Sequence, residues 1–468
     1  MQFKKRENSG LKHFVESISI LKSLNADREI HIIKADSYKL ELPASVVKKE
    51  HEFSVTAKRS ISGGVFYKRK KFKKIIAEWS DAEFVMEKIF TTNLFRDGFE
   101  AEVGVIKSKE FSEKKKQYQR LIIPVKKKIS FFFIIEDRTF ETPTLHSRGC
   151  VRANFENYFI DIFPYTDKEK KDFLILDCPV KISHDEFGDA AFACLVTLGY
   201  LTGKLTQNEG VYFSYSKKEM IIPTALKFSS FRPSINSMHH PVSSNPYGFK
   251  VRGRKGDRLN KKMNPISEIE FSKLCQLVFN KTDLRAALLL LMEVLKESIF
   301  TMAAGMAVIL ETLTNLYAKE NPDYFIYVKQ PKISSAILKE LRFVITNHKA
   351  EIGDVTEKLI DKVNQINQVS NKIKLSKPFE LLGFILNEDD KRIIERRNDL
   401  LHGRLSLNYD DDIEKADSEL YLIATKLYTL VNVLILKQIG FSGYIINWPV
   451  YNKHVHKQKL KEEVFRMI

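Results

Sequence analysis

The chain has 468 residues and a formal net charge of +17, with 44% hydrophobic and 29% charged residues. This balance excludes an intrinsically disordered chain, and the length predicts two or three globular domains. The basic excess favours a polyanionic partner, although a Lys-rich surface without such a partner gives the same total.

The sequence contains no clear pattern for a secretion signal, a membrane segment or a disulfide framework. Met1–Arg28 mixes polar and apolar residues, and no uncharged apolar run reaches the about 18 residues that a membrane span needs, so we expect neither a secretion signal nor a membrane segment. Four cysteines without paired spacing predict neither a zinc site nor a disulfide framework: Cys150, Cys178, Cys194 and Cys275. We therefore expect no cofactor or metal and a location in the reducing cytoplasm.

Residues 1–230 alternate short apolar runs with polar turns, which predicts a β-rich or α+β region. A helix is expected at Asp81–Ile89, and a capping box at Ser183 opens another through Leu198, closed by Gly199 and Gly203. Strands and one turn are expected at Glu29–Ile33, Tyr38–Leu42, Ser62–Gly64 (the turn), Leu121–Ile123, Ile129–Ile135 and Glu209–Tyr215.

Three basic clusters interrupt this region, with aromatic residues between them. They are Lys68–Lys71 with Lys73 and Lys74, Lys114–Lys116 and Lys126–Lys128, and the aromatic residues are Tyr67, Phe72 and Tyr118. Such a mixture is typical of single-strand-binding surfaces, where bases stack on rings and phosphates meet cations. Edge strands that carry Lys while their aromatic residues point inward give the same pattern, and we favour that alternative.

Residues 231–265 are rich in Pro, Ser, Gly, Arg and Lys, which predicts a basic loop or linker. His239 and His240 fall here without a nearby cysteine or carboxylate cluster, so a solvated loop is favoured over a metal site. The basic run Lys250–Lys262 can guide RNA, but a plain linker is the simpler interpretation.

Residues 266–468 have helical periodicity nearly to the end, which predicts an all-α bundle. A long helix over Thr282–Ala318, rich in Leu, Ala and Met, is expected at its centre. Other helices are expected at Ser267–Asn280, Ile333–His348, Val355–Ile373, Asp389–His402 and Asp411–Gly440, and the tail from Tyr444 predicts a strand and a last helix.

One polar stretch in this bundle carries candidate chemistry. Arg397 and His402 are five residues apart near the end of a helix, and Gly403 follows as a helix terminator. A permanent cation beside an imidazole suits phosphodiester chemistry. The spacing alone is weak, because similar pairs recur at Arg6…His13, Arg232…His239 and Arg342…His348.

The interior of the motif is more informative. Asn398 and Asp399 are polar, and Leu400-Leu401 can anchor the helix. Here the sequence resembles the HEPN family of small helical-bundle ribonucleases, whose signature is Arg, a polar residue, a few further positions and then His. With the β-rich first region, the chain is similar to the ApeA-like branch of anti-phage proteins.

The resemblance implies a metal-independent endoribonuclease with Arg397, Asn398 and His402 as catalytic residues. It also implies a homodimer through the C-terminal helical domain, in which two His402 residues share acid and base work. RNA would be the substrate, and abortive infection the role. Residues 1–230 would be a sensor or regulatory region on which a phage-derived trigger acts. The alternative is a non-catalytic HEPN dimerisation or nucleic-acid-binding module.

Glu311 is a charge among apolar residues of the predicted long helix. A buried carboxylate is costly unless it is paired. Arg397 or Arg396 is therefore a candidate partner for it, and an exposed Glu on the helix surface is the alternative. Arg404, just after the motif, is a further candidate for RNA contact, with a plain surface role as the default.

Overall fold

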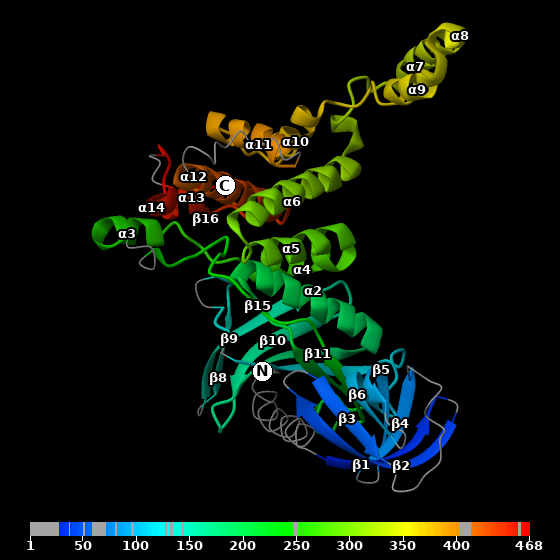
Figure 1. Cartoon of the computed structure of the whole chain (residues 1–468). Coiled ribbons are helices and arrows are strands. Elements are labelled where there is room, and N and C mark those ends of the chain that lie inside the picture. Colours follow the sequence, from blue (N-terminus) through cyan, green and yellow to red (C-terminus); the bar gives the residue numbers. More distant parts are fainter. Residues whose placement is uncertain are drawn as a thin grey trace. The chain divides into compact units, whose positions relative to one another are not determined.

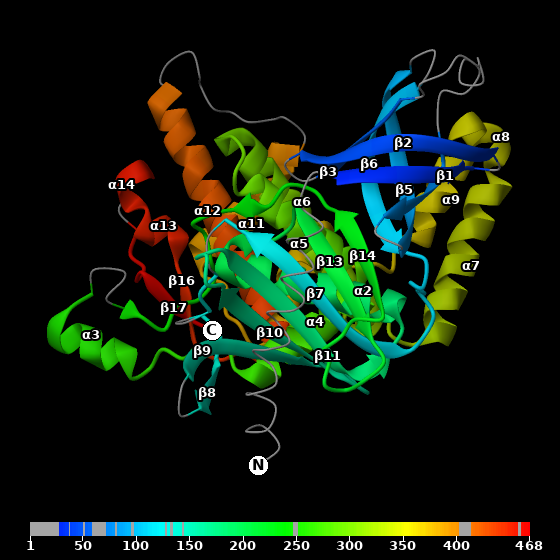
Figure 2. The same ribbon diagram turned by 90° about the horizontal axis from the view of Figure 1, so that it is seen from below.

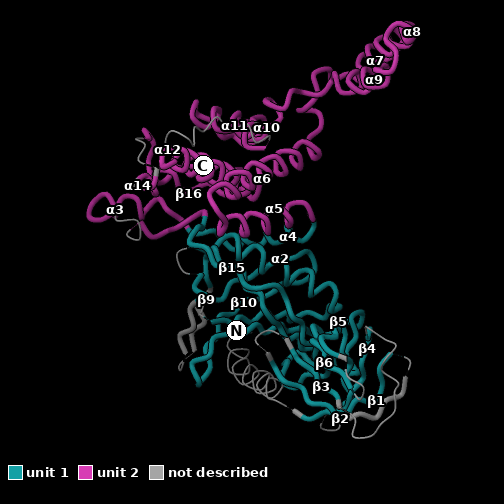
Figure 3. Tube along the Cα trace, viewed as in Figure 1, with its two compact units in different colours: residues 1–240, 265–280 teal, residues 241–264, 281–468 magenta. Residues whose placement is uncertain are grey.

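The computed structural model divides the chain into two compact units, residues 1–240 with 265–280 and residues 241–264 with 281–468 (Figure 3). It describes residues 28–36, 38–49, 52–58, 72–79, 82–94, 98–126, 129–131, 134–142, 145–246, 251–401, 413–456 and 460–468. The α+β class is confirmed, with a β-rich first part and a helical second part (Figure 1).

The division is more interleaved than the sequence suggests. Helix α4 (Glu268–Asn280) packs on α2 (His184–Thr202) and belongs to the first unit. The expected linker is shared between the units, and its basic part holds a helix, α3 (Gly253–Asn260). His239 is buried rather than solvated, and Ser237 Oγ lies 3.1 Å from its Nδ1.

Six strands of the first unit close into a barrel, because β3 pairs with β6 as well as with β2. The strands, blue in Figure 1, are β1 (Arg28–Ala35), β2 (Tyr38–Lys49), β3 (Glu52–Lys58), β4 (Lys74–Trp79), β5 (Ala82–Leu94) and β6 (Gly98–Ser108). Alternate residues point inward, as period-2 strands require. In β6 these are Phe99, Ala101 and Val103, all buried in the barrel core.

Strand β5 overturns the predicted helix at Asp81–Ile89. It pairs with β4 on one side and β6 on the other. Phe84 and Met86 face the core, while Glu83 and Glu87 on the opposite face form ion pairs with Lys109 and Lys107, each at 2.8 Å. The local residues favour a helix, but pairing with two neighbouring strands outweighs that preference.

The sheet continues from β6 beyond the barrel in the order β14, β13, β7, β11, β10, β9, β8 (Figure 2). Helix α2 packs on β7 and β11, and α4 packs on α2 and β9. Ser183 caps α2 by accepting a hydrogen bond from Glu186 N, and Gly203 ends it with φ of 73°, so the helix runs through Gly199. The strand bounds are β7 (Gln117–Val125), β8 (Arg138–Thr142), β9 (Leu145–Asn154), β10 (Phe159–Thr166), β11 (Asp172–Ile182), β13 (Glu209–Tyr215) and β14 (Ala225–Ser230), with a short pair β12 (Lys204–Leu205) and β15 (Ile235–Asn236).

In its described residues, the segment Ile129–Ile135 is not the predicted strand. Ile129 and Phe131 are buried without strand pairing, and Ile135 forms a single bridge to Ile266. Strands at Glu29–Ile33, Tyr38–Leu42, Leu121–Ile123 and Glu209–Tyr215 agree with the structure. The expected turn at Ser62–Gly64 lies outside the described residues.

The second unit is built around α12 (Ile413–Gln438), which packs on α6 (Ile299–Glu320), α10 (Asn371–Leu381) and α11 (Glu388–Leu401). By length and apolar composition, α6 and α12 pass as membrane-spanning helices, as does the core helix of many soluble proteins, and the most apolar window of α12 is 89% buried. The other elements are α5 (Thr282–Val294), η3 (Pro322–Tyr324), α7 (Pro331–Asn347), α8 (Lys349–Ile352), η4 (Gly353–Val355), α9 (Thr356–Asn364), β16 (Tyr444–Ile446), α13 (Trp448–Tyr451), α14 (Lys453–His456) and β17 (Phe465–Met467).

Two predicted helices are interrupted. The helix expected over Thr282–Ala318 is α5 followed by α6, because Ser298 starts a new helix by accepting a hydrogen bond from Thr301 N. The close approach of Gly305 to Val294 leaves no room for a Cβ between these helices. Ser370 likewise opens α10 and separates it from α9, and the tail from Tyr444 includes a final strand instead of a final helix.

Candidate functional site

The candidate motif lies at the end of α11. The helix begins with a reciprocal cap, in which Asn387 N donates to Asp390 at 3.0 Å and Asp390 N donates to Asn387 Oδ1 at 2.8 Å. Ile393 and Ile394 are buried, and Arg397 follows them by four and three residues. Side chains at these spacings share one helix face, so Arg397 points into the bundle.

Arg397 forms an ion pair with Glu311 of α6. The distance from Arg397 Nη2 to Glu311 Oε2 is 3.1 Å, and the Arg397 side chain is only 4% exposed whereas that of Glu311 is 41% exposed. Glu311 is thus both paired with Arg397 and half-exposed, so each of the two alternatives from the sequence is partly correct. Arg396 is not its partner.

Three consecutive residues of α11 are fixed by ion pairs to three other helices. Glu395 Oε1 lies 2.6 Å from Lys372 Nζ of α10, Arg396 pairs with Glu419 of α12, and Arg397 pairs with Glu311 of α6. The end of α11 is therefore held at a defined position in the bundle. His402 follows Leu401, the last residue of the helix, directly in the chain.

The remaining motif residues are not placed. The side chain of Asn398 and the whole of His402, Gly403 and Arg404 lie outside the described residues. Of the predicted catalytic residues, the structure thus positions Arg397 alone.

Comparison with known proteins gives no match. No family model, no curated protein and no solved structure is similar to this chain. The function therefore has to be argued from the residues themselves.

The other Arg…His pairs differ from the motif. His239 is buried, and burial together with neighbouring His240 lowers its pKa to about 4. His348 is exposed at the end of α7, with its Nδ1 2.8 Å from Glu351 Oε2. Arg6 and His13 lie outside the described residues.

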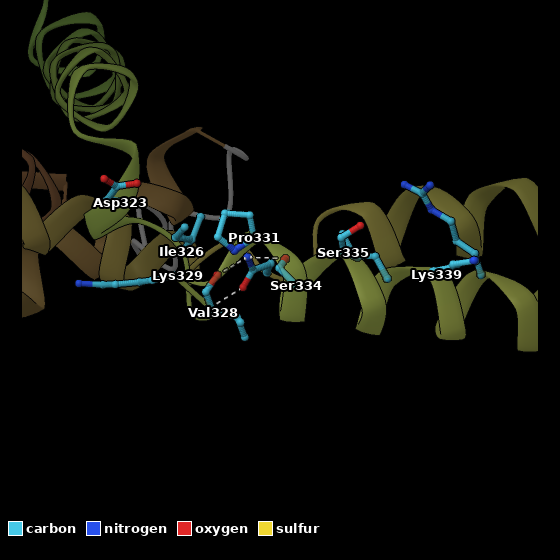
Figure 4. Close-up of a pocket in the computed structure, with 11 residues that line it drawn as sticks. Asp323, Ile326, Val328, Lys329, Pro331, Ser334, Ser335 and Lys339 are labelled. Carbon is cyan, nitrogen blue, oxygen red and sulfur yellow. Dashed lines mark hydrogen bonds between the residues drawn. The ribbon is translucent and has the colours of Figure 1, made fainter.

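A basic pocket opens in the second unit where α7 begins (Figure 4). Its volume is about 640 Å³, and its charged lining residues are Lys329, Lys339, Arg342 and Asp323. Figure 4 shows Lys329 and Lys339 at opposite ends, with Ser334 and Ser335 between them. The net positive lining suits an anionic ligand.

Asn367 supports the wall of this basic pocket. Its Nδ2 donates to Ser334 Oγ at 3.0 Å and to Val328 O at 3.1 Å, and its Oδ1 accepts from Val328 N at 2.7 Å. The sequence patterns do not indicate this pocket. Lys339 and Arg342 three residues apart on one helix were its only local signal, since Lys329 and Asn367 join them through folding.

The aromatic residues of the N-terminal basic clusters do not favour base stacking. Phe72 is buried in the barrel core, 4.8 Å from the Phe99 ring centroid, and Tyr118 packs against the same core. Lys114–Lys116 are exposed just before β7. Tyr67, Lys68–Lys71 and Lys127–Lys128 lie outside the described residues. The inward-pointing alternative is confirmed for Phe72 and Tyr118.

A buried network of four charges lies at the other end of α11. Asp390 receives Lys426 Nζ at 3.1 Å and Arg466 Nη1 at 3.0 Å, and Lys426 also pairs with Glu462. Burial alone would raise the pKa of Asp390, but the Arg466 hydrogen bond and the two cations outweigh it and lower the pKa. Lys426 lies inside the apolar run of α12, and this position was the sequence signal for the network. Each of the four charges contacts an opposite charge within the network, which is typical of a structural element.

No metal site emerges from the described part of the chain. Across those ranges, no three His, Cys, Asp or Glu side chains come together as metal ligands would. The four cysteines all belong to the described residues and are buried, unbridged thiols.

Proposed function

We propose that the chain is a metal-independent endoribonuclease of the HEPN type, acting in the cytoplasm in anti-phage defence. Its catalytic residues are Arg397, Asn398 and His402. The observation that carries the proposal is Arg397 itself, a cation held by Glu311 at the end of α11, five residues before His402. A guanidinium fixed in advance needs little reorganisation when it binds a phosphate.

The proposed chemistry divides the work between a cation and an imidazole. A neutral His402 removes the proton from a 2′-hydroxyl, and the 2′-oxygen attacks the adjacent phosphorus. A protonated His402 from a second copy gives a proton to the departing 5′-oxygen. Arg397 stabilises the charge on the phosphorane, and Asn398 orients the imidazole. The products are a 2′,3′-cyclic phosphate and a 5′-hydroxyl.

RNA binding is supported by charge. The net charge is +17, and the basic pocket lies in the same unit as the motif. Phosphate contacts of this kind give affinity that falls steeply with salt. The pocket would hold RNA backbone outside the cleavage site.

Dimerisation through the helical unit is supported by exposed apolar side chains on α7. Ile333, Ile337 and Val344 are exposed and fall on one side of the helix by their spacing of four and seven. Such a stripe is more apolar than a helix needs when it faces only water. The first unit is the proposed site of restraint and of trigger binding.

A second candidate is a non-catalytic dimerisation or nucleic-acid-binding module. The 4% exposure of the Arg397 side chain favours it, because a buried, paired arginine also serves structure alone. Both candidates predict salt-sensitive RNA binding, so binding does not separate them.

Cleavage separates them. Purified wild type, His402→Ala and His348→Ala would be incubated with total cellular RNA in EDTA, and the ends of the products analysed. His348 is a matched control because it also follows an arginine, Arg342, but is exposed and paired with Glu351. We expect cleavage by wild type and His348→Ala, with cyclic-phosphate ends, and none by His402→Ala.

A restrained enzyme would show no cleavage after purification, so toxicity on expression is the second test. If wild type is toxic on induction during phage infection and His402→Ala is not, the ribonuclease proposal stands even when the purified protein is silent. Equal toxicity of the two, or cleavage that survives in His402→Ala, contradicts the proposal and favours the binding module.

A further inference from the structure

A second pocket lies within the first unit, remote in sequence from the motif. Its volume is about 500 Å³, within the range of small-molecule sites. Strand β5 contributes Lys88 and Phe90, α2 contributes Phe192, and the segments flanking β13 and β14 contribute Gln207, Phe231 and Arg232. It thus combines three phenylalanines, two cations and one amide.

The backbone at Lys88 is strained. Its φ is 52°, in the left-handed region, and it falls between the pairs Glu87↔Val105 and Ile89↔Val103. Gly104 stands opposite, where an added Cβ would lie 3.3 Å from Lys88 Cβ. A left-handed conformation is unfavourable for a non-glycine residue, and such strain concentrates at functional sites.

The phenylalanines offer faces to a flat ligand. Phe90 is 64% exposed, so its ring is accessible from the pocket. The ring of Phe231 lies against β13 at Gly210, where an added Cβ would come within 2.8 Å of it. Rings exposed in a pocket bind other aromatic rings by stacking.

Gln207 gives the pocket a hydrogen-bonding edge. The residue is 7% exposed, lines the pocket, and its side-chain amide bonds to no residue that the structure describes. Its amide atoms are not enclosed by the protein, so they are accessible from the pocket. A ligand that presents a donor beside an acceptor can bond to both amide atoms, and the edge of a nucleobase does so.

The charges specify the rest of the ligand. Neither Lys88 nor Arg232 pairs with an acid among the described residues, so both remain available to an anion. Glu102 also lines the pocket and can accept a hydrogen bond from an exocyclic amine. The carboxylate therefore favours adenine, cytosine or guanine over uracil.

We infer that this pocket binds a nucleotide. The base stacks on Phe90, Phe192 and Phe231, the amide of Gln207 reads the base edge, and Lys88 and Arg232 hold the phosphate. The ligand is either a mononucleotide or one unit of a single strand, since both present the same groups. The inference makes no use of Arg397 or His402 and stands independently of the ribonuclease proposal.

Calorimetry with the full-length chain tests this. The probes are the four nucleoside monophosphates, adenosine, ribose 5-phosphate and a single-stranded RNA octamer of mixed sequence. The octamer is titrated into the His402→Ala variant. Mononucleotides contain no internucleotide bond, so failure of the ribonuclease proposal does not affect this result. We expect AMP, CMP or GMP to bind more tightly than UMP, and adenosine and ribose 5-phosphate to bind at least about tenfold more weakly than AMP.

Three variants assign the contacts. Arg232→Ala and Lys88→Ala should each weaken binding about tenfold, the loss of one charge-assisted hydrogen bond. Lys170→Ala is a matched control, because Lys170 also has a positive φ, of 62°, but lies in the turn before β11. Gln207→Leu should abolish base preference and leave the melting temperature of the ligand-free protein unchanged, whereas replacing a structural glutamine would lower it.

The outcomes are distinct. Binding of mononucleotides identifies a free nucleotide as the ligand, and binding of the octamer alone identifies a single strand. Absence of both, or binding unchanged in Arg232→Ala and Gln207→Leu, overturns the inference.

Discussion

Arg397 Nη2 lies 3.1 Å from Glu311 Oε2, and this contact joins the last turn of α11 to the middle of α6. A nearly buried guanidinium thus depends on a carboxylate that water still reaches. The pair has two roles, since it compensates a charge inside the bundle and fixes the residue proposed to bind phosphate. Each role makes its own prediction.

Glu311→Gln should lower the free energy of unfolding by about 1–2 kcal/mol, because it leaves the Arg397 charge without its carboxylate, while the exposure of Glu311 moderates the loss. Urea unfolding measures it. In a double-mutant cycle with Arg397→Met, the coupling should exceed about 0.5 kcal/mol. Glu340→Gln, on the surface of α7, is the control, and zero coupling would show that the pair does not stabilise the bundle.

A buried ion pair in the sheet should contribute more to the free energy of unfolding than the Arg397–Glu311 pair does. Arg120 on β7 is buried and binds Asp177 on β11 twice, through Nε at 2.7 Å and Nη2 at 2.9 Å. Asp177→Asn should cost about 3–5 kcal/mol, since it leaves a buried guanidinium uncompensated. Glu169→Gln removes an exposed ion pair with Lys171 and should change the free energy of unfolding by less than about 1 kcal/mol. Equal effects of the two changes would contradict this prediction.

The buried four-charge network predicts acid sensitivity of the second unit. The pKa of Asp390 is lowered in the folded state, so its contribution to stability is complete above its ordinary pKa and is lost as the pH falls below about 4. Asp390→Asn should therefore flatten the decline of stability in that acid range. Hydrogen exchange of α12 peptides, measured from pH 5 to pH 3, reports it. An unchanged decline in the variant would remove Asp390 as the cause.

His184, at the start of α2, predicts a second pH dependence at higher pH. Burial first, and then Lys227 and Lys107, lower its pKa to about 3. Between about pH 6.5 and pH 3 the unfolded chain binds a proton that the folded chain does not, so stability falls with falling pH by up to about 1.4 kcal/mol per unit. His184→Asn should reduce this slope in urea titrations. The same change at exposed His31 should leave the slope as in wild type.

The sequence predicted the order of strands and helices well where the pattern is local. Ser183 and Gly203 define α2 because capping needs only neighbouring residues. The start of α11 was likewise predicted within one residue, at Asp389 instead of Glu388. Local signals of this kind do not depend on the rest of the fold.

The failures arise where distant residues decide. Ala82–Leu94 is a strand because β4 and β6 pair with it on both sides, which local helix preference does not reveal. The partner of Arg397 lies 86 residues earlier in the chain, and its identity is set by the crossing of α6 and α11. Both pockets are likewise assembled from separate elements, so composition alone did not indicate them.

Because the two units are interleaved along the sequence, recombination is restricted in how it can exchange them. The backbone passes between them at residues 240–241, 264–265 and 280–281. A single crossover at any of these points would combine segments of two parents within one unit. After a crossover at 240–241, for example, α4 and the rest of the first unit would come from different parents. The two units therefore cannot be exchanged separately by one crossover, and we expect them to diverge together as one gene.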